Sequence, residues 1–297
     1  MRALIFTDGR KGHESQSVAF CELKGLEFEF CKVSYKNKIL KILSYFLDFL
    51  GLKFKIFECE NKNFANFDIF VGAGSVTYYP LKYCAAKFGK KSVALMYPKG
   101  YKKDFSLIFA NAHDTTQTAP NVVILPTNLN LSKVANFYTP KKSAIGFVIG
   151  GPNASFDMNS KICEIVEKIK AKFPRHEYAL TTSPRTPRDI EAQFERANFD
   201  FSVIYSKNQI NPIGDFLEGC EWIFITQDSV SMISEAVCNG VANVAVLALP
   251  RKNSHNKFDD FIANLAQNEC LRIYAKNSEL KPTKKINLSQ ILQGISL

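Results

Sequence analysis

Short apolar segments alternate with segments of helical periodicity along most of the chain, and this alternation constrains the fold more than any other feature of the sequence. Apolar runs of about 4–8 residues are typical of buried strands, and strands that alternate with helices form parallel sheets. In the first half we expect helices at residues 14–24, 39–50 and 76–88. Strands are expected at residues 3–7, 28–33, 67–71, 92–96, 105–109 and 122–125.

The pattern stops at residues 128–142, which lack periodicity and carry Pro140 before two lysines, as a linker does. It then restarts, with strands expected at residues 144–149, 177–181, 201–205, 222–226 and 242–247, and helices at 158–173, 188–197, 212–220, 229–238 and 258–266. Two such series predict an α/β fold of two Rossmann-like domains facing a cleft, at residues 1–135 and 143–297. The prediction leaves open that the C-terminal segment packs back on the first domain.

The composition of the 297 residues is globular, with 46% hydrophobic and 22% charged residues. Apolar stretches such as residues 244–249 are far shorter than the ~20 residues of a spanning helix, and residues 3–9 do not read as a signal peptide. The eight cysteines are scattered, with no C-x-x-C pair and no cluster at metal-ligand spacing. We therefore expect a cytoplasmic protein with reduced cysteines in its core.

The net charge of +10 is unevenly distributed along the chain. Residues 1–142 hold 21 of the 38 Lys and Arg but only 11 of the 28 Asp and Glu, so the first half carries the whole excess. A general compositional bias would have charged both halves alike. The asymmetry predicts an anionic partner for the first half, such as a phospholipid surface or a phosphorylated acceptor. No nucleic-acid motif accompanies the charge, and we expect no nucleic-acid partner.

The basic half contains an amphipathic segment that begins at Lys36 and ends at Lys55. Its apolar residues form a wide helical face, and lysines flank that face on both sides. Two interpretations stay open. The segment is an interfacial helix that lies on an anionic membrane, or it is a crossover helix buried on its sheet, which explains the apolar face equally well and which we favour slightly.

Ligands of open parallel sheets bind beyond the carboxyl ends of the strands, so the loops after strands are the candidate sites. The loop after residues 3–7 contains Asp8, His13 and two glycines, and it opens a helix whose N-terminus favours anions. His13 can serve as a general base near neutral pH, although a helix start with a solvated histidine is the simpler alternative. We propose His13 and Asp8 as catalytic residues. Acceptor-side candidates in this half are Gly12, Glu14, Gln16, His113 and Asp114.

A second loop of the first half, residues 72–75, contains two glycines and also opens a helix. It either holds a phosphate or only turns the chain, because a lone glycine pair is a weak signal. The first loop does not match G-x-G-x-x-G, which disfavours a nicotinamide enzyme.

In the second half, loops after three strands carry hydroxyls, glycines and one guanidinium, which together suit the phosphates of a ligand. The strongest signal follows residues 222–226, where a helix is expected to begin at about Asp228. On that helix, Asp228, Ser231 and Glu235 would share one face. Capping explains Asp228 but leaves Glu235 unexplained. The donor-binding candidates are Gly150, Gly151, Asn153, Thr182, Ser183, Arg185, Thr186, Asp228, Ser229, Ser231, Met232 and Glu235.

Several of these motifs together resemble a known family. D-G-R-K-G-H-E-S-Q at residues 8–16, I-G-G-P-N at 149–153, T-T-S-P-R-T-P at 181–187, N-P-I-G-D-F-L at 211–217 and D-S-V-S-M-I-S-E-A at 228–236 are similar to the mitochondrial-fission (elongated-mitochondria) family, which is grouped with GT-B-type glycosyltransferases. The family's motif T-S-R-R-T-P reads T-S-P-R-T-P here, with Pro184 in place of the first arginine. The resemblance therefore assigns phosphate contact to Arg185 alone. The glycine loop with His13 is also similar to that of the lipid-linked N-acetylglucosaminyltransferase of peptidoglycan synthesis.

The resemblance implies a GT-B-like enzyme that needs no metal and no cofactor, with a nucleotide-sugar as its substrate. We expect it to move the sugar to an envelope glycolipid of the lipooligosaccharide type, working in the cytoplasm or peripherally on the inner face of the cytoplasmic membrane. Two alternatives stay open. One is an epimerase-like enzyme acting on a UDP-sugar, and the other is a non-catalytic adaptor that associates with membranes.

Overall fold

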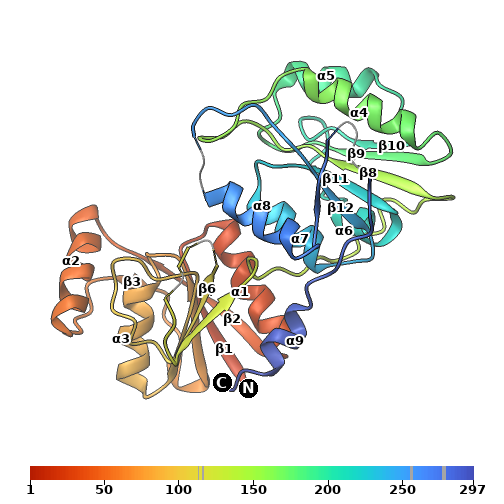
Figure 1. The fold of residues 1–297 in the computed structure, drawn as a ribbon. Coiled ribbons are helices and arrows are strands. Elements are labelled where there is room, and N and C mark those ends of the chain that lie inside the picture. Colours follow the sequence, from red (N-terminus) through yellow and green to blue (C-terminus); the bar gives the residue numbers. More distant parts are fainter. Residues whose placement is uncertain (113, 116, 255–256, 276–278) are drawn as a thin grey trace. The chain divides into compact units, whose positions relative to one another are not determined.

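A computed structural model describes residues 1–112, 114–115, 117–254, 257–275 and 279–297. The chain forms two compact units, which Figure 1 shows coloured along the sequence. The N-terminal unit consists of Met1–Asn130 and Asn287–Leu297, and the C-terminal unit consists of Leu131–Ile286. The chain thus changes unit after residues 130 and 286, whereas the predicted boundaries lay at 135 and 143. Its last segment returns to the N-terminal unit, an arrangement that the sequence left open.

The N-terminal unit is built on one seven-stranded sheet in the order β3-β2-β1-β4-β5-β6-β7. Its pairs are parallel except for the antiparallel pair of β2 and β3. The strands are β1 (Arg2–Thr7), β2 (Glu27–Ser34), β3 (Glu58–Cys59), β4 (Ile69–Ala73), β5 (Lys91–Leu95), β6 (Leu107–Asn111) and β7 (Val122–Leu125). The helices are α1 (Lys11–Leu23), α2 (Lys38–Leu50), α3 (Tyr78–Phe88), α9 (Leu288–Gln293) and a 3-10 turn at Phe64–Asn66.

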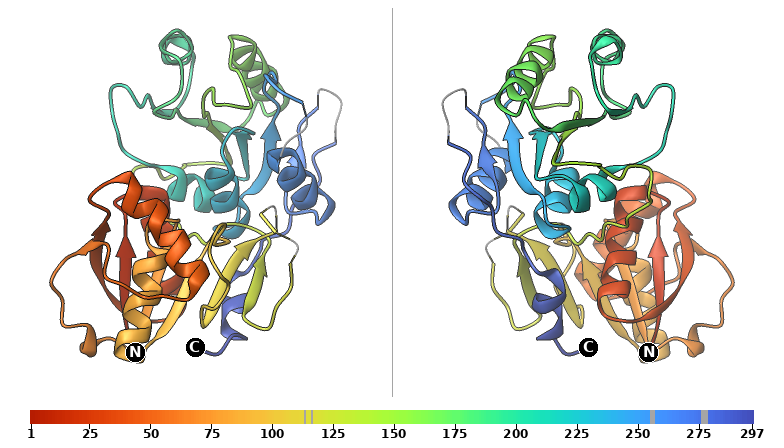
Figure 2. Two further views of the ribbon diagram at one scale, coloured as in Figure 1. Left: turned by 90° about the vertical axis from the view of Figure 1, so that its left-hand side faces the viewer. Right: turned by 90° about the vertical axis from the view of Figure 1, so that its right-hand side faces the viewer.

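Successive residues of β1 point to opposite faces of this sheet, and each face is covered by helices. Ala3 and Ile5 are buried in a cluster that includes residues of α1 and Leu292 of α9. Leu4 and Phe6 are buried in a second cluster that includes residues of α3. Both views of Figure 2 show α9 beside the sheet of this unit. An all-apolar strand is therefore explained by burial on both sides.

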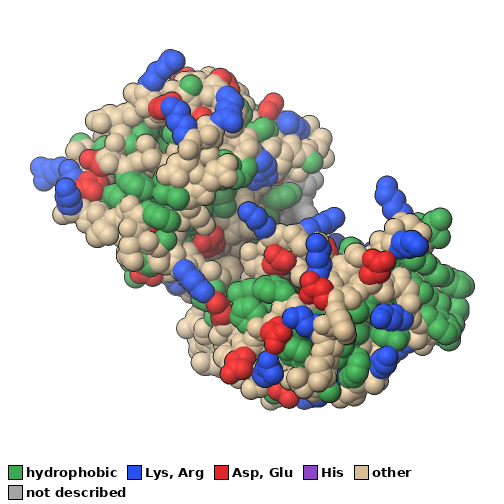
Figure 3. All heavy atoms as spheres, turned by 180° about the vertical axis from the view of Figure 1, so that it is seen from behind, with side chains coloured by type: hydrophobic (Ala, Val, Ile, Leu, Met, Phe, Trp, Pro, Cys, Tyr) green, Lys and Arg blue, Asp and Glu red, His purple; other side chains and the backbone are tan. Residues whose placement is uncertain are grey.

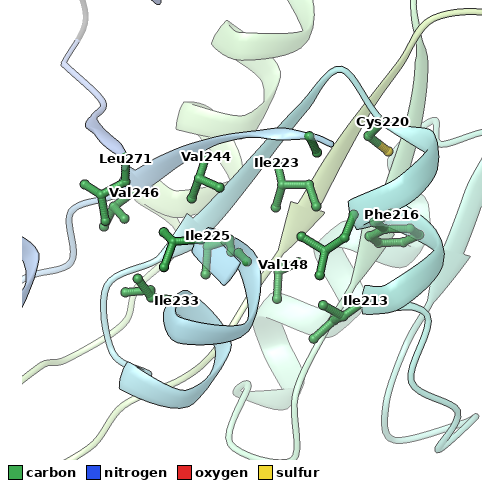
Figure 4. Packing of buried hydrophobic residues seen from close by; sticks show 14 of the residues in the cluster. Val148, Ile213, Phe216, Cys220, Ile223, Ile225, Ile233, Val244, Val246 and Leu271 are labelled. Atoms are coloured by element: carbon green, nitrogen blue, oxygen red, sulfur yellow. The ribbon is translucent and has the colours of Figure 1, made fainter. Parts of the chain in front are cut away.

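The C-terminal unit repeats this plan with a six-stranded sheet in the order β10-β9-β8-β11-β12-β13, and all of its pairs are parallel. The strands are β8 (Ala144–Val148), β9 (Glu177–Thr181), β10 (Phe201–Val203), β11 (Trp222–Thr226), β12 (Asn243–Leu247) and β13 (Arg272–Ile273). The helices are α4 (Lys161–Lys172), α5 (Arg188–Arg196), α6 (Ile213–Gly219), α7 (Val230–Cys238) and α8 (Lys257–Gln267). Figure 4 shows one packed face, where Ile223 and Ile225 of β11 meet Phe216 of α6 and Ile233 of α7.

Each sheet has one point at which the strand order reverses. In the N-terminal unit, β1 leads to β2 on one side and the chain later returns to β4 on the other side of β1. In the C-terminal unit, β8 leads to β9 on one side, and β11 later pairs with the other side of β8. The loops after the two flanking strands diverge at such a point and leave room for a ligand. The candidate sites therefore lie at the carboxyl ends of β1 and β4 in the first sheet and at the carboxyl ends of β8 and β11 in the second.

The predicted α/β class with two Rossmann-like domains (GT-B-like) is confirmed. The structure adds the short strands β3 and β13 and the helix α9, which the periodicity did not reveal. Helix α1 begins at Lys11, three residues before its predicted start, so His13 lies in its first turn. The predicted linker is irregular but attached, because the carboxylate of Asp215 accepts hydrogen bonds from four successive backbone N–H groups of residues 135–138, at 2.7–3.2 Å.

The slightly favoured burial of the amphipathic segment on its sheet holds for one side of its apolar face and is wrong for the other. Helix α2 buries Leu47 in the core together with Ser44 and Asp48, and it leaves Ile39, Ile42, Phe46 and Phe49 exposed. The two polar side chains face the unit beside Leu47 because they find partners there, as described below. Among the described residues, no helix is both long and apolar enough to cross a membrane.

Candidate functional site

Asp8 and His13 form a hydrogen-bonded pair at the carboxyl end of β1. The imidazole Nδ1 lies 3.0 and 3.1 Å from the two carboxylate oxygens. The side chain of Asp8 is 6% exposed and that of His13 is 18% exposed. Because a carboxylate accepts, the bond favours the tautomer with the proton on Nδ1, which leaves Nε2 as the acceptor nitrogen. An imidazole held in this way can take a proton from a substrate hydroxyl.

Gly74 provides the space in which the His13 ring lies. Strand β4 pairs with β1, with Gly72 opposite Phe6, so the loop after β4 adjoins the loop after β1. Gly74 has a φ of +86°, and a Cβ atom there would lie 2.3 Å from Cε1 of His13. No side chain can occupy that position while the ring stays in place. The loop at residues 72–75, left open as a phosphate site or a turn, thus has a third role, which is to seat the imidazole.

The acceptor-side candidates are only partly brought together. Glu14 accepts a 2.6 Å hydrogen bond from the Thr7 hydroxyl, and the Gln16 amide donates to the Gly12 carbonyl at 3.4 Å. Asp114 follows β6, which β4 and β5 separate from β1, and it pairs with Lys99 at 3.1 Å. At about 4.8 Å per strand this places the end of β6 roughly 14 Å from that of β1. His113 lies outside the described residues.

Asp228 is the centre of the cluster at the second reversal point. One carboxylate oxygen accepts from the Thr226 hydroxyl at 2.7 Å. The other accepts from the Gly151 N–H at 3.1 Å and from the Arg185 guanidinium at 2.6 Å. The carboxylate is completely buried, and this burial raises its pKa, while the three partners oppose the increase. Asp228 therefore joins the loops after β8, β9 and β11.

The two glycines after β8 are required by this close packing. A Cβ atom on Gly150 would lie 2.2 Å from a carboxylate oxygen of Asp228, and one on Gly151 would lie 2.1 Å from the carbonyl oxygen of Arg185. Their N–H groups are also engaged, since Gly150 donates to the Thr226 hydroxyl at 2.7 Å and Gly151 to Asp228. Both donors thus bind protein atoms in this structure, and the donor-binding role of the two glycines stays a prediction.

The hydroxyl groups of the loop after β9 are also engaged in hydrogen bonds within the protein, whereas its arginine is only partly engaged. Thr186 donates to the Gly150 carbonyl at 2.5 Å, and Thr182 donates to Glu191 at 2.8 Å. The Ser183 hydroxyl accepts from the Arg185 N–H at 3.2 Å. The Arg185 side chain is 43% exposed, and Asp228 holds one of its terminal nitrogens. Arg185 is thus a fixed cation with an accessible surface.

Asp228 does not share a helical face with Ser231 and Glu235, contrary to the sequence prediction. Helix α7 begins at Val230, and Ser229 is its N-cap, accepting from the Met232 N–H at 3.4 Å. Asp228 precedes the cap, and its main-chain carbonyl accepts from the Asn153 amide at 2.9 Å. Ser231 is exposed on the first turn, and Met232 is half-buried.

Glu235 is held by a residue that the sequence did not single out. Its carboxylate accepts a 2.7 Å hydrogen bond from the hydroxyl of Ser132, and burial raises its pKa. Ser132 belongs to the segment that Asp215 fastens to this unit. A serine in an aperiodic stretch gives no signal of such a contact. Among the described residues, no three His, Cys, Asp or Glu side chains gather as metal ligands would.

A family model for mitochondrial fission ELM1 matches residues 11–290 of the chain. The chain is also similar to the uncharacterized protein RP120 of Rickettsia prowazekii (strain Madrid E), with 27% identity over 144 residues, which cover 46% of this chain and 40% of that protein. The match thus spans less than half of that relative's length.

Two solved structures are similar in fold. One is a candidate UDP-N-acetylglucosamine 2-epimerase of Listeria monocytogenes, with a TM-score of 0.54 and 11% identity, covering 93% of this chain and 84% of that one. The other is MurG of Acinetobacter baumannii, with a TM-score of 0.49 and 12% identity, covering 94% and 86%. At such identities, the likeness to the Listeria protein concerns the fold alone.

Proposed function

We propose that this chain, which belongs to the mitochondrial fission ELM1 family, is a glycosyltransferase that moves a sugar from a nucleotide-sugar to a glycolipid of the lipooligosaccharide type. The observation that carries the proposal is the Asp8–His13 pair at the reversal point of the N-terminal sheet. It supplies an oriented base where an open parallel sheet binds ligands. The acceptor is expected at the inner face of the cytoplasmic membrane.

In the proposed reaction, Nε2 of His13 takes the proton of an acceptor hydroxyl. The acceptor oxygen forms a bond to the anomeric carbon of the sugar, and the bond from that carbon to the nucleoside diphosphate breaks. Asp8 keeps the imidazole in the required tautomer and stabilises the imidazolium that forms. Asp8 therefore acts as a positioning residue in this mechanism and not as an alternative base.

Arg185 is the proposed partner of the leaving diphosphate. Its guanidinium is exposed yet held by Asp228, so it offers a charge whose orientation is already fixed. The first turn of α7, with Ser229 and Ser231, follows the loop that contains Asp228 and favours an anion. The fold shared with a candidate UDP-sugar epimerase supports a nucleotide-sugar as the ligand. No metal and no cofactor are assigned to the reaction.

Two variants test this division of roles. His13→Ala should reduce turnover about 100- to 10,000-fold while nucleotide affinity, measured by calorimetry with UDP, GDP, CMP, ADP and dTDP, stays unchanged. Arg185→Met should weaken nucleotide binding about tenfold or more. The control is His176→Ala, because His176 also pairs with a carboxylate, Glu221, at 3.0 Å, but away from both reversal points. Weakened binding in His13→Ala with normal turnover would contradict the proposal.

A second candidate function is epimerisation of a UDP-sugar, which the fold shared with the Listeria protein favours. It predicts conversion of the nucleotide-sugar when no acceptor is present. Product analysis of a reaction without acceptor separates the two functions, because a transferase leaves the donor intact under that condition.

A further inference from the structure

Helix α2 carries an apolar face that is turned to the solvent. Ile39 is 74% exposed, Ile42 66%, Phe46 58% and Phe49 70%. Their spacing places these four side chains on one side of the helix. Leu50, the last residue of the helix, is also exposed, and the exposed Leu52 and Phe54 continue the apolar surface beyond its end. We name these seven residues the α2 ridge. Figure 3 shows hydrophobic side chains gathered at the end of the N-terminal unit that carries α2 in Figure 1.

The opposite face of α2 is fastened to its unit by polar contacts. Asp48 is buried, pairs with Lys82 at 2.7 Å and accepts from the Lys102 N–H at 2.7 Å. The Ser44 hydroxyl is buried and lies 2.9 Å from the Tyr101 hydroxyl. Rolling the helix to bury its apolar face would separate Asp48 from Lys82, a buried pair that Asp104 also joins, and would break the hydrogen bond from the Lys102 N–H. The outward orientation of the ridge is therefore specified by the fold.

Positive charge surrounds the ridge. Lys36 and Lys38 are exposed at the start of α2, and Lys53 and Lys55 are exposed after its end. Asp48 is the single acidic residue of this 36–55 segment, and it is buried against Lys82. The Lys102 ammonium also lies 6.0 Å from the centre of the Phe49 ring. The exposed charge of the segment is consequently all positive.

We propose that the α2 ridge and its lysines dock the N-terminal unit onto an anionic lipid bilayer. Phe, Leu and Ile side chains would enter the boundary between headgroups and acyl chains while the lysines meet lipid phosphates. Lysine is depleted at protein–protein interfaces but enriched around interfacial membrane helices, and this contrast favours lipid over a protein partner. The inference deepens the proposed function by naming the surface that meets the acceptor's membrane, yet the docking itself does not depend on sugar transfer.

The docking surface is physically connected to the candidate base. The Lys41 ammonium on the inner side of α2 donates to the carbonyl of Ser75. Ser75 follows Gly74, whose bare backbone seats the His13 ring. Docking by the ridge would therefore hold the loop beside His13 close to the lipid surface, where a lipid-borne hydroxyl is found.

Vesicle co-sedimentation tests the proposal. The wild-type protein should bind vesicles of phosphatidylcholine with about one quarter phosphatidylglycerol, and bind phosphatidylcholine alone more weakly. The triple variant Ile42→Ser, Phe46→Ser, Phe49→Ser should lose binding about tenfold or more. The matched control is Val241→Ser with Ile273→Ser, because both residues are exposed apolar side chains of the C-terminal unit. Circular dichroism confirms that each variant is folded.

Neutralising the lysines should abolish the preference for anionic vesicles. Each lysine near the surface contributes about fivefold, and the variant is Lys36→Gln, Lys38→Gln, Lys53→Gln, Lys55→Gln. Equal binding by the triple variant and its control would overturn the proposal. A second result would also overturn it: the wild-type protein does not bind vesicles and is a dimer in sedimentation velocity, and the triple variant is a monomer. The ridge would then be covered by a second copy of the chain. Nucleotide affinity measured in the same variants reports separately on the proposed transferase.

Discussion

Replacing Gly74 by alanine is the sharpest test of the geometry around His13. A Cβ atom at this position would overlap the imidazole, with 2.3 Å to Cε1 and 2.5 Å to Nδ1. The ring must then move, and the nitrogen that would be displaced is the one that bonds Asp8. The same substitution also places alanine at a φ of +86°, which is unfavourable for any residue with a side chain.

The two costs can be separated with Gly89→Ala. Gly89 has a φ of +64°, and nothing lies within 4 Å of its added Cβ, so it carries the backbone strain without the collision. That strain costs about 1–2 kcal/mol in either variant. Losing the charged hydrogen bond between His13 and Asp8 costs about a further 1–3 kcal/mol, reduced by the partial exposure of His13. We expect Gly74→Ala to be the less stable variant by roughly that second amount.

Urea titration gives the free energy of unfolding of both variants, and nitrogen-detected NMR of the imidazoles gives the tautomer of His13. The chain has four histidines, so assignment by substitution is practical. Gly74→Ala should shift the His13 nitrogens, and Gly89→Ala should leave them in place. If the two variants lose the same stability and the His13 signals stay unchanged in both, the close approach of Gly74 to the ring is refuted.

Two further outcomes follow from buried charges. Asp215→Asn places an amide N–H against backbone N–H groups that now donate to the carboxylate, and it should lower the free energy of unfolding by about 2–4 kcal/mol. The control Asp189→Asn, at an exposed position, should change the free energy of unfolding by less than about 0.5 kcal/mol. Similar values for the two variants would contradict the anchoring role of Asp215. Burial lowers the pKa of Lys41 to about 8 in the folded chain, whereas the lysine of the unfolded chain keeps its proton up to about pH 10.4. Between these pH values the unfolded chain binds more protons than the folded chain, so the free energy of unfolding rises with pH. Urea titrations at about pH 7 and pH 9.5 should show the wild type gaining stability relative to Lys41→Met, and a relative loss would reverse the assignment.

Most of the fold could be predicted because its strands are apolar on both faces. Strand β11, with five buried residues in a row, is recognisable from sequence alone. The order of the strands is not, because a crossover can place the next strand on either side of the first. The neighbours of β1 and β8 are therefore known only from the structure, and with them the contact between Gly74 and His13.

The sequence predicted the residues of the candidate site better than it predicted the contacts that they make. Asp228 was assigned to a helical face, but burial and its partners Thr226 and Arg185 keep its carboxylate beneath the loops. Glu235 was identified without Ser132, because their 103-residue separation leaves no local pattern. Helix α2 was misjudged because periodicity reports that a helix has an apolar side but not which way that side faces.

The return of α9 to the N-terminal unit affects the order in which the chain can fold during its synthesis. The C-terminal unit has all of its residues once Ile286 has left the ribosome, whereas the N-terminal unit still lacks Asn287–Leu297. Until those residues emerge, the buried cluster that includes Ile5 and Phe20 lacks Leu292. Lys24 likewise lacks the carbonyls of Leu292 and Ile295, to which it donates at 3.1 and 2.9 Å. The unit that is translated first is therefore the last to be completed, and its nascent form must persist with an open edge of its core.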